Sequence, residues 1–407
     1  MSASDRQRER IGRRMVDSHP IIRLAVIQPT VPDYRVPLFQ HVGSFQDISL
    51  TVFADCRNMA GRPRAANPKG AFTLVHSSLH RGGPFFFQPG SVRVGWKESY
   101  DAVVFSWNSR HLDLVPLLLS CRRRGIRTIA WGHGYGKNEN RVRRSVRMAL
   151  ARLADGVLLY DQRTARALSC ELPDKRIFVA PNVLCQERIQ SARSEWMRSG
   201  DVAGFSKSKA LGSKTILFCS RLEPHKRVDL LLRAFAIVAD RLDSDLVLIG
   251  GGTDAGNLRS LARTLGIEKR VRFLGPLYDE KELAPWFSAA KLMVMPTQLG
   301  LSIYHAFGYG LPVITSEDPF EHGPEFTALM PGVNGEVFRG GDTAQLASVL
   351  VNLLNDPGRL EKLSAGAYAS AVGDEAWTIE RTARAFADAV RAVVRSADAL
   401  NSSGVSG

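Results

Sequence analysis

Two cations that follow a predicted strand could bind a diphosphate. Arg221 and Lys226 lie in SRLEPHKR (220–227), between the strand TILFCS (215–220) and a helix predicted over 228–240. Basic side chains beside the unpaired N–H groups of a helix N-terminus bind phosphate groups. The alternative is a solvated basic turn. The residue types and spacing therefore make this loop a candidate anion site.

A histidine between glycines follows another predicted strand. The segment WGHGYG places His133 directly after residues 127–131, where its ring could exchange a proton with a substrate near neutral pH. The alternative is a hydrogen-bonded loop histidine. The loop after the first predicted strand carries Asp33, Tyr34 and Arg35. These three side chains could line the same cleft or form the polar rim of a proline-stiffened loop.

Two further stretches bring glycine and histidine to strand ends. Gly251 lies in the Gly250–Gly252 run after the strand LVLIG, where glycines let a backbone approach a ligand or simply make a sharp turn. The stretch PTQLGLSIYHAFGYGLPVIT (296–315) contains Gly300 in a turn and His305 in a short apolar helix. His305 is either a site residue or a histidine buried by its neighbours.

The elements that position these residues alternate between strand and helix through most of the 407 residues. Continuous apolar strands between helices are typical of parallel sheets covered on both faces, and ligands bind beyond their carboxyl ends. We predict an α/β protein with two Rossmann-like domains facing each other across a cleft. The expected organisation is a disordered basic tail (1–20), a first Rossmann-like domain (21–187), a linker (188–213), a second Rossmann-like domain (214–374) and a closing helix (375–399) that packs back toward the first domain.

Composition and charge narrow the class of protein. No run reaches the roughly 20 apolar residues of a membrane span, and the first 20 residues lack the apolar stretch of a secretory signal. The five cysteines are scattered and show no metal-binding spacing, which favours reduced thiols in a cytoplasm. The expected location is cytoplasmic, with peripheral attachment to the inner face of the plasma membrane as an option.

Positive charge is concentrated in one region. Residues 121–152 carry ten lysines and arginines against a single acid, Glu139. The segment Arg141–Asp155 reads as a basic amphipathic helix, with its cations in Arg141–Arg152 and one face formed by Val142, Val146, Ala149, Leu150 and Leu153. Such a helix could meet an anionic membrane surface or pack its apolar face on its own sheet. Aromatic side chains do not alternate with the cations, so nucleic acid is not the expected partner.

Taken together, these segments resemble GT-B glycosyltransferases of family 4. The resemblance covers nearly the whole chain and rests on SRLEPHKRVDLLLRAF, LVLIGGGTD, VRFLGPLYDEKELAPWFSAAKLMVMPT and HAFGYGLPVITSED with GVNGEVF, and in the first half on YRVPLF, WGHGYG and Ala180-Pro181-Asn182. It implies transfer of a sugar from a nucleotide diphosphate sugar with retention of configuration. The positive charge of residues 121–152 favours an acceptor that is a saccharide or a lipid-linked molecule, such as a cell-envelope polysaccharide or lipopolysaccharide intermediate.

The resemblance implies that residues 21–187 bind the acceptor and that residues 214–374 bind the nucleotide sugar. It also assigns roles to individual positions. Arg221 and Lys226 match the pair that holds the donor diphosphate, and His133 matches a histidine near the reacting sugar. Donor contacts are implied for Gly251, for the backbone near Leu274, and for the turn Gly300, Leu301 and Ser302. With two cations at the diphosphate and no acidic pair at a strand end, neither a metal nor another cofactor is expected.

This chain departs from the family at two positions. Members usually carry two glutamates separated by seven residues, and these positions fall on Thr297 and His305. Neutral side chains there can still accept a hydrogen bond from a hydroxyl group. We hypothesise that His305, together with Glu325 or His322, replaces the missing pair. The alternative is a non-catalytic nucleotide-sugar-binding or scaffold relative; a nucleotide-sugar epimerase on the same fold is a third possibility.

Overall fold

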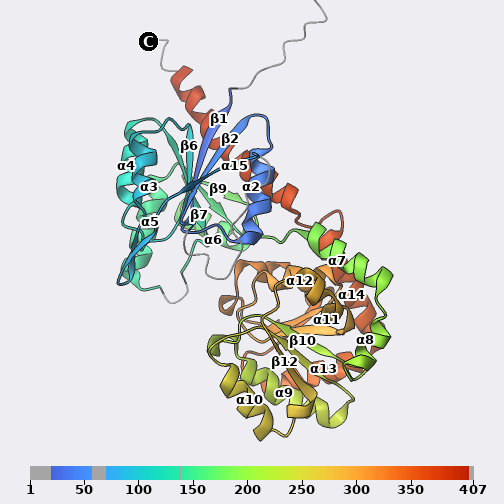
Figure 1. Cartoon of the computed structure of the whole chain (residues 1–407). Helices are drawn as coiled ribbons and strands as arrows, with labels where there is room; N and C mark the ends of the chain where they lie inside the picture. The colour runs from blue at the N-terminus through green and yellow to red at the C-terminus, as the bar shows by residue number, and fades with distance from the viewer. Residues whose placement is uncertain (1–19, 57–69, 137–138, 403–407) are drawn as a thin grey trace, which may run out of the picture.

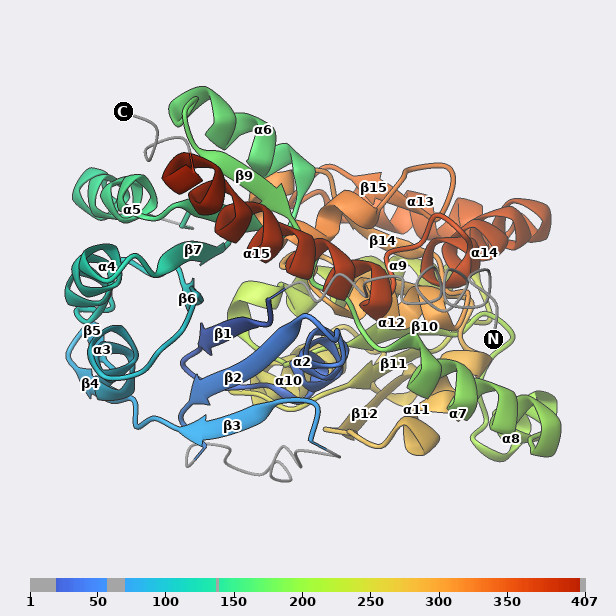
Figure 2. The same ribbon diagram turned by 90° about the horizontal axis from the view of Figure 1, so that it is seen from above.

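The computed structural model describes residues 20–56, 70–136 and 139–402, arranged as two α/β domains stacked one above the other (Figure 1). The expected basic tail lies, apart from Pro20, outside the described residues. Each domain is built around its own parallel sheet with helices on both faces, and a second view shows the helices of the first domain surrounding its sheet (Figure 2). The predicted fold class, two Rossmann-like α/β domains, is therefore confirmed.

The first domain contains a seven-stranded parallel sheet in the order β3-β2-β1-β6-β7-β8-β9. Its strands are β1 (Ile22–Ile27), β2 (Ile48–Ala54), β3 (Thr73–His76), β6 (Ala102–Ser106), β7 (Arg127–Gly132), β8 (Gly156–Leu159) and β9 (Arg176–Val179). The accompanying elements are the 3-10 helix η1 (Asp33–Arg35), the helices α2 (Val36–Gly43), α3 (Pro89–Trp96), α4 (Leu114–Arg123), α5 (Arg141–Leu153) and α6 (Gln162–Glu171), and an antiparallel hairpin of β4 (His80–Gly82) and β5 (Phe85–Phe87).

The second domain contains a six-stranded parallel sheet in the order β12-β11-β10-β13-β14-β15. Its strands are β10 (Ile216–Cys219), β11 (Leu246–Ile249), β12 (Val271–Gly275), β13 (Leu292–Met295), β14 (Val313–Ser316) and β15 (Gly335–Phe338). Its helices are α9 (Val228–Arg241), α10 (Ala255–Thr264), α11 (Glu280–Ala289), α12 (Ser302–Gly308), α13 (Thr343–Leu354) and α14 (Pro357–Val372), with short 3-10 turns η2 (Pro224–Lys226), η3 (Glu268–Arg270), η4 (Pro319–Glu321) and η5 (Pro324–Ala328).

Each sheet reverses its strand order once, and the loops on the two sides of that reversal run in opposite directions. In the first sheet the reversal falls between β1 and β6, and in the second it falls between β10 and β13. Connections leave such neighbouring strands in opposite directions, which opens a crevice beyond their carboxyl ends. The loop with Arg221 and Lys226 follows β10, and the loop with Gly300 follows β13. The second crevice therefore lies between the two loops with donor-site candidates.

The last described helix, α15 (Ile379–Ser402), returns to the first domain and completes its core (Figures 1 and 2). Ala383, Phe386 and Val390 are buried in the same apolar cluster as strand residues of the first sheet. The Phe386 ring meets Trp131 edge to face, with ring centroids 5.1 Å apart. Arg391 adds an ion pair with Asp47, at 2.7 Å. The first domain is therefore built from two separate stretches of the chain.

Residues 188–213, expected to be a linker, are largely helical. They belong to α7 (Gln186–Ser199) and α8 (Val202–Ser208). Ile189 and Ala192 of α7 are buried against the second domain, and Phe205 of α8 meets Trp286 of α11 with ring centroids 5.0 Å apart. Sparse apolar residues at helical spacing are enough to hold these helices because α11 supplies a surface for them.

Replacing Phe386 by alanine should destabilise the first domain. Removal of a fully buried aromatic ring typically costs about 3–5 kcal/mol, and the lost ring here also packs on Trp131. We expect the first domain to unfold at lower urea concentration. Arg384→Ala, on an exposed position of the same helix, should change stability by less than about 0.5 kcal/mol. Equal stability of the two variants would contradict the tethering role of α15.

Candidate functional site

The two loops at the crevice of the second sheet are joined by Lys226. Its Nζ donates a hydrogen bond of 2.7 Å to the main-chain oxygen of Gln298, in the loop after β13. Arg221, five residues earlier, has an exposed side chain. Gln298 has φ 54°. This left-handed conformation is unfavourable in free energy for a residue that carries a side chain. The structure thus brings both predicted diphosphate-binding cations to the edge where ligands of this fold bind.

The glycine run after β11 is required by close backbone packing. Gly250 has φ 143°, and a side-chain carbon there would lie 1.9 Å from the main-chain oxygen of Ser220. A carbon on Gly252 would lie 2.1 Å from that of Leu222. The main-chain oxygen of Gly251 accepts a hydrogen bond from the Leu222 amide at 2.9 Å. These glycines shape the Arg221 loop, whether or not Gly251 also meets the donor.

The remaining predicted donor contacts surround the same crevice. The main-chain oxygen of Gly275, the residue after Leu274, accepts from the Gly250 amide at 2.8 Å, so the loops after β11 and β12 are joined. Leu301 and Ser302, at the start of α12, are partly exposed. A side-chain carbon on Gly300 would lie 4.0 Å from Oε2 of Glu325. The sequence-predicted set is therefore gathered at the carboxyl end of one sheet.

The hypothesis that His305, together with Glu325 or His322, replaces the missing glutamates stays a prediction, but the structure gives His305 a different hydrogen-bond partner. Nε2 of His305 lies 2.7 Å from Oε1 of Glu280, the first residue of α11. His322 is buried and fully engaged: Nδ1 accepts from the Leu299 amide at 3.2 Å, and Nε2 lies 2.9 Å from the main-chain oxygen of Ser316. His322 therefore holds two loops together. The sequence pattern missed the partner because Glu280 follows a different strand.

Thr297, the other position of the missing pair, also turns inward. Its hydroxyl donates a 2.7 Å hydrogen bond to the main-chain oxygen of His225, in the loop after β10. Like Lys226, it joins the loops after β10 and β13. The lone pairs of this oxygen can still accept a bond, but the side chain has no charge with which to replace a carboxylate.

Arg35 is packed behind the surface of the cleft and does not form its rim. Its Nη2 donates to the Tyr160 hydroxyl at 2.6 Å, its Nη1 donates to the Gln28 side chain, and its guanidinium stacks over Trp131 at 4.5 Å. A planar cation stacked on an indole is a rigid arrangement. Asp33 and Tyr34 are partly exposed beside it.

His133 lies beside Tyr160, a hydrogen-bond partner of Arg35. Its side chain is exposed, and its ring centroid is 4.7 Å from that of Tyr160. Gly134, the next residue, has φ 73°, which glycine adopts at little cost and which turns the chain sharply after β7. The predicted acceptor-side histidine thus faces the cleft from the first domain.

Glu325 connects the two domains. Its Oε1 accepts a hydrogen bond of 3.2 Å from the Asn182 amide, in the segment that follows β9. Burial raises the pKa of this carboxyl above its ordinary value, although Asn182 and the positive charge of Arg35 act in the opposite direction. Desolvation is the dominant effect because the side chain is almost fully enclosed.

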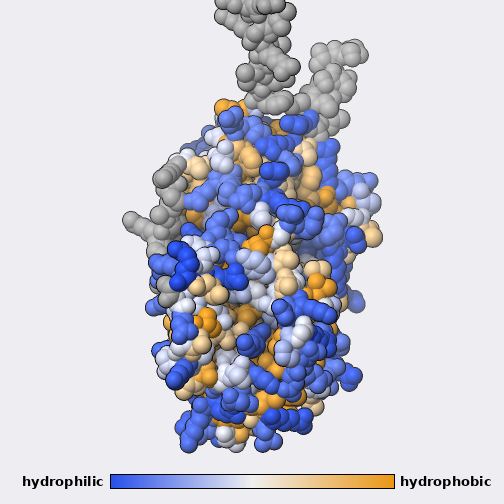
Figure 3. Space-filling model, turned by 90° about the vertical axis from the view of Figure 1, so that its right-hand side faces the viewer, coloured by the Kyte–Doolittle hydropathy of each residue, from blue (hydrophilic) through white to orange (hydrophobic). Residues whose placement is uncertain are grey.

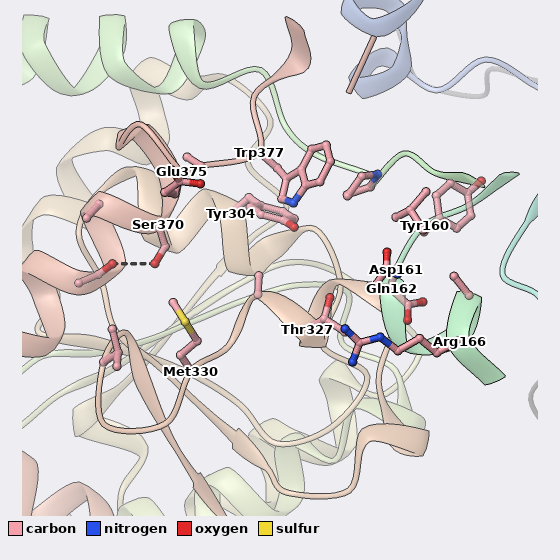
Figure 4. Close-up of a pocket in the computed structure, with 18 of the residues that line it drawn as sticks. Tyr160, Asp161, Gln162, Arg166, Tyr304, Thr327, Met330, Ser370, Glu375 and Trp377 are labelled. Carbon is pink, nitrogen blue, oxygen red and sulfur yellow. Dashed lines mark hydrogen bonds between the residues drawn. The ribbon is translucent and has the colours of Figure 1, made fainter. Parts of the chain in front are cut away.

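One end of the interdomain cleft forms a pocket of about 810 Å³. Asp161, Gln162 and Arg166 line it from the first domain, and Figure 4 shows Arg166 extending from α6 toward the second domain. From the second domain it is lined by Tyr304, Thr327, Met330, Ser370, Glu375 and Trp377. Polar and aromatic side chains of both domains can therefore contact one ligand.

Sequence reasoning missed several of these residues. Tyr160, Asn182 and Trp377 reach the cleft only through tertiary packing, and each sits in an ordinary strand-end or loop segment. Glu280 is the first residue of a helix, where an acid is favoured by the helix dipole alone. Only the order of the strands in the sheet brings Glu280 to His305.

Two facing Rossmann-like domains with these loops at the cleft define the GT-B fold of glycosyltransferases. Solved structures share it over almost the whole chain. Anabaena HepE, solved in complex with UDP, has a TM-score of 0.68 at 17% identity and covers 91% of this chain and 100% of its own. A glycosyltransferase from Rickettsia africae has a TM-score of 0.70 at 11% identity, with 92% and 99% covered. At such identities the likeness establishes the fold.

Sequence comparison finds similarity mainly in the second domain. Residues 213–356 match the family described as glycosyl transferases group 1. A D-inositol 3-phosphate glycosyltransferase from Thermobispora bispora is 37% identical over 198 residues, which are 45% of this chain and 45% of the relative. An enzyme of that name from Catenulispora acidiphila is 36% identical over 174 residues, or 39% and 40%. The chain thus spans less than half the length of these curated relatives.

Replacing Glu325 by glutamine should change how stability depends on pH. Between the ordinary glutamate pKa and the raised pKa of Glu325, the native state binds more protons than the unfolded state. Wild-type stability therefore falls as pH rises through this window, and the uncharged variant escapes that loss. We expect the melting temperature of Glu325→Gln, relative to wild type, to increase between about pH 4 and pH 7.

The matched control is Glu317→Gln, which removes an exposed acid from a nearby loop. Its melting temperature relative to wild type should stay nearly constant over the same range. A constant difference for Glu325→Gln as well would show that burial at the domain junction does not perturb this carboxyl.

Proposed function

We propose that this protein is a glycosyltransferase that moves a sugar from a nucleotide diphosphate sugar to an acceptor. The observation that carries the proposal is the pair Arg221 and Lys226 at the strand-order reversal of a domain that matches glycosyl transferases group 1. HepE, which shares the fold, was solved with UDP and with UDP-glucose. A nucleoside diphosphate sugar is the ligand that suits two cations beside a nucleotide-binding type of sheet.

We further propose a retaining reaction of the family 4 type. The bond between the sugar and the diphosphate breaks, a bond to the acceptor oxygen forms on the same face, and a phosphate oxygen of the leaving group takes the acceptor proton. Arg221 and Lys226 stabilise the negative charge that grows on the diphosphate. Because these cations supply the charge, we propose that turnover needs no divalent metal, which activity in excess chelator would test.

The first domain supplies the acceptor side in this proposal. His133 is exposed above Tyr160 and can donate to or accept from a sugar hydroxyl. Glu325 lies at the junction, beside Gly300 of the donor crevice and bonded to Asn182. A ligand held between the domains would thus contact both, and closure around it would exclude water that otherwise hydrolyses the donor.

Removing either cation should abolish nucleotide binding at ordinary concentrations. In wild type, a nucleotide at about 100 times its dissociation constant should add roughly 2.7 kcal/mol to stability. We expect a clear thermal shift with UDP, GDP or one of their sugar conjugates, and loss of most of it in Arg221→Ala and Lys226→Ala. Lys269→Ala, an exposed lysine at the opposite end of β12, should keep the full shift.

The outcomes separate the enzyme from its alternative. A shift together with sugar transfer or donor hydrolysis supports the glycosyltransferase. A shift without any turnover, over a wide range of acceptors, would favour the non-catalytic nucleotide-sugar-binding relative. No shift with any nucleotide would contradict the proposed function of the site.

For the acceptor, we propose a lipid-linked intermediate of cell-envelope or exopolysaccharide assembly, presented at a membrane surface. Support comes from one side of the first domain, where Figure 2 shows the hairpin β4–β5, α4 and α5 along the same edge. No helix among the described residues is long and apolar enough to cross a membrane. The relatives named D-inositol 3-phosphate glycosyltransferase make a small phosphorylated acceptor the competing proposal.

The surface of α4 is apolar where a solvated helix would be polar. Its outward stripe contains Val115 and Leu119, which are 45% and 50% exposed, and ends at the exposed Arg122 and Arg123; Leu112, in the turn just before α4, extends the stripe and is 58% exposed. The main-chain oxygen of Phe86 accepts a 3.0 Å bond from the Leu112 amide, which places the hairpin with the exposed Phe85 and Phe87 beside this stripe. The opposite side of the molecule is mostly hydrophilic, with scattered apolar residues (Figure 3).

Helix α5 contributes less than its sequence predicts. Leu150 is buried, so the predicted apolar face splits, leaving Val142 and Val146 exposed. Arg147 is buried and paired with Glu139 at 2.9 Å, and Arg144 pairs with Glu171. The cations available to an anionic surface are therefore fewer than the ten in the sequence. The exposed apolar stripe of α4 was not predicted. A helix that covers a parallel sheet always has a buried apolar face, so apolar residues in its sequence do not by themselves indicate a second, exposed apolar stripe.

We expect the protein to cosediment at low salt with vesicles of phosphatidylcholine and phosphatidylglycerol, and less with phosphatidylcholine alone. Each arginine near an anionic surface contributes about 1 kcal/mol, so the double change Arg122→Ser and Arg123→Ser should weaken binding at least about tenfold. Leu119→Ser should weaken it at every salt concentration. Arg384→Ser, an exposed arginine on α15, is the matched control. Equal binding by all variants would contradict this surface.

A further inference from the structure

Glu280, His305 and Tyr309 form a cluster between α11 and α12. Oε1 of Glu280 lies 2.7 Å from Nε2 of His305 and accepts a 2.9 Å bond from the Tyr309 hydroxyl. The His305 ring stacks on Phe287 of α11, with centroids 4.3 Å apart. Burial acts to raise the pKa of Glu280, but the bonds from His305 and Tyr309 outweigh it and lower the pKa. The carboxylate is therefore held ionised in a fixed position.

The cluster leaves one oxygen of the Glu280 carboxylate, Oε2, able to accept further hydrogen bonds. Both hydrogen bonds go to Oε1, and no described residue donates one to Oε2. The side chain of Glu280 is 25% exposed, against 14% for His305. An ionised carboxyl has about four acceptor positions, so this one can still accept from two hydroxyl groups. His305 and Tyr309 use their own protons to hold the acid, which makes them supports and leaves Glu280 to face a ligand.

The cluster lies at the edge where the donor is proposed to bind. Glu280 begins the helix that follows β12, and His305 lies in the helix that follows β13, so both stand near carboxyl ends of the sheet. Cys219 ends β10, two residues before Arg221. Burial, together with the negative charge of Glu280, raises the pKa of the Cys219 thiol to about 12. Glu280 at the start of α11 and the Arg221 loop after β10 therefore stand at the same edge of the second sheet.

A carboxylate at this place would repel a diphosphate but attract hydroxyl donors. In a nucleoside diphosphate, the ribose is joined directly to the diphosphate and presents two neighbouring hydroxyl groups. Acids in doubly wound sheets commonly accept bonds from ribose hydroxyls. Resting on the proposed function, we propose that Glu280 accepts hydrogen bonds from the ribose hydroxyls of the donor nucleotide, and that His305 and Tyr309 are positioning residues that hold it.

The assignment explains how a histidine can stand where the resemblance calls for a glutamate. The acid comes from the neighbouring helix. His305 has the opposite role to the one expected from sequence, because it donates a hydrogen bond to an acid, whereas the sequence suggested that it accepts one. The charge near the nucleotide is retained, and the residue that carries it has moved from α12 to α11.

The test compares UDP with 2′,3′-dideoxy-UDP, and GDP with its dideoxy form, by calorimetry on the whole protein. Hydrogen bonds to charged groups contribute about 1.5–3 kcal/mol, so wild type should prefer the ribonucleotide at least about tenfold. Glu280→Ala should bind both forms with nearly equal affinity, close to that of wild type for the dideoxy form. Glu280→Gln, which keeps the shape and one acceptor, should give an intermediate ratio. Glu282→Gln, an exposed acid on the same helix, should keep the wild-type ratio.

His305 provides a second arm that separates positioning from folding. His305→Ala should reduce the preference for the ribonucleotide, and His305→Gln, whose amide can still donate to Glu280, should restore much of it. A purely structural role would change both affinities together and leave their ratio unchanged. If Glu280→Ala binds nucleotides but keeps the wild-type preference, this assignment is overturned and the proposed function stands. If no nucleotide binds wild type, both are overturned.

Discussion

Parallel strands place all the loops that follow them at one edge of the sheet, and the rest of this structure depends on that constraint. Each domain obeys it separately, and the chain sets the two edges face to face. The strand order reverses once in each sheet, so each edge has one crevice. Lys226 and Thr297 then join the loops on the two sides of the second crevice. Residues far apart in sequence become neighbours with no special sequence signal.

This constraint also explains what could be predicted from sequence. The apolar strands of both sheets are nearly continuous runs, so their existence and the fold class followed from composition and spacing. Because parallel strands share an edge, the candidates after β10, β11 and β13 could be assigned to one site before any contact was known. Short strands such as β9 and the β4–β5 hairpin lack a strong pattern, and α7 and α8 have few apolar residues, so these elements were missed.

Side-chain partners could not be predicted, for a different reason. Glu325 or His322 was expected to act together with His305, whereas the structure pairs His305 with Glu280 on the neighbouring helix. Arg35 was expected to line the cleft or to form the polar rim of its loop, but its guanidinium stacks on Trp131. In each case a buried polar group takes a hydrogen-bonding or stacking partner that offsets its burial. Which partner that is depends on how the helices pack across the sheet. Periodicity shows which face of a helix is buried, but it does not identify the neighbour.

The return of α15 to the first domain has a consequence for the order of folding during synthesis. Ala383, Phe386 and Val390 complete the core beneath the first sheet, so the domain translated first lacks part of its interior until almost all of the described chain has been made. The second domain draws its core from one continuous stretch and can close earlier. Domains usually fold in the order in which they leave the ribosome. Here the later domain can mature first, and the earlier sheet must wait with an uncovered apolar face.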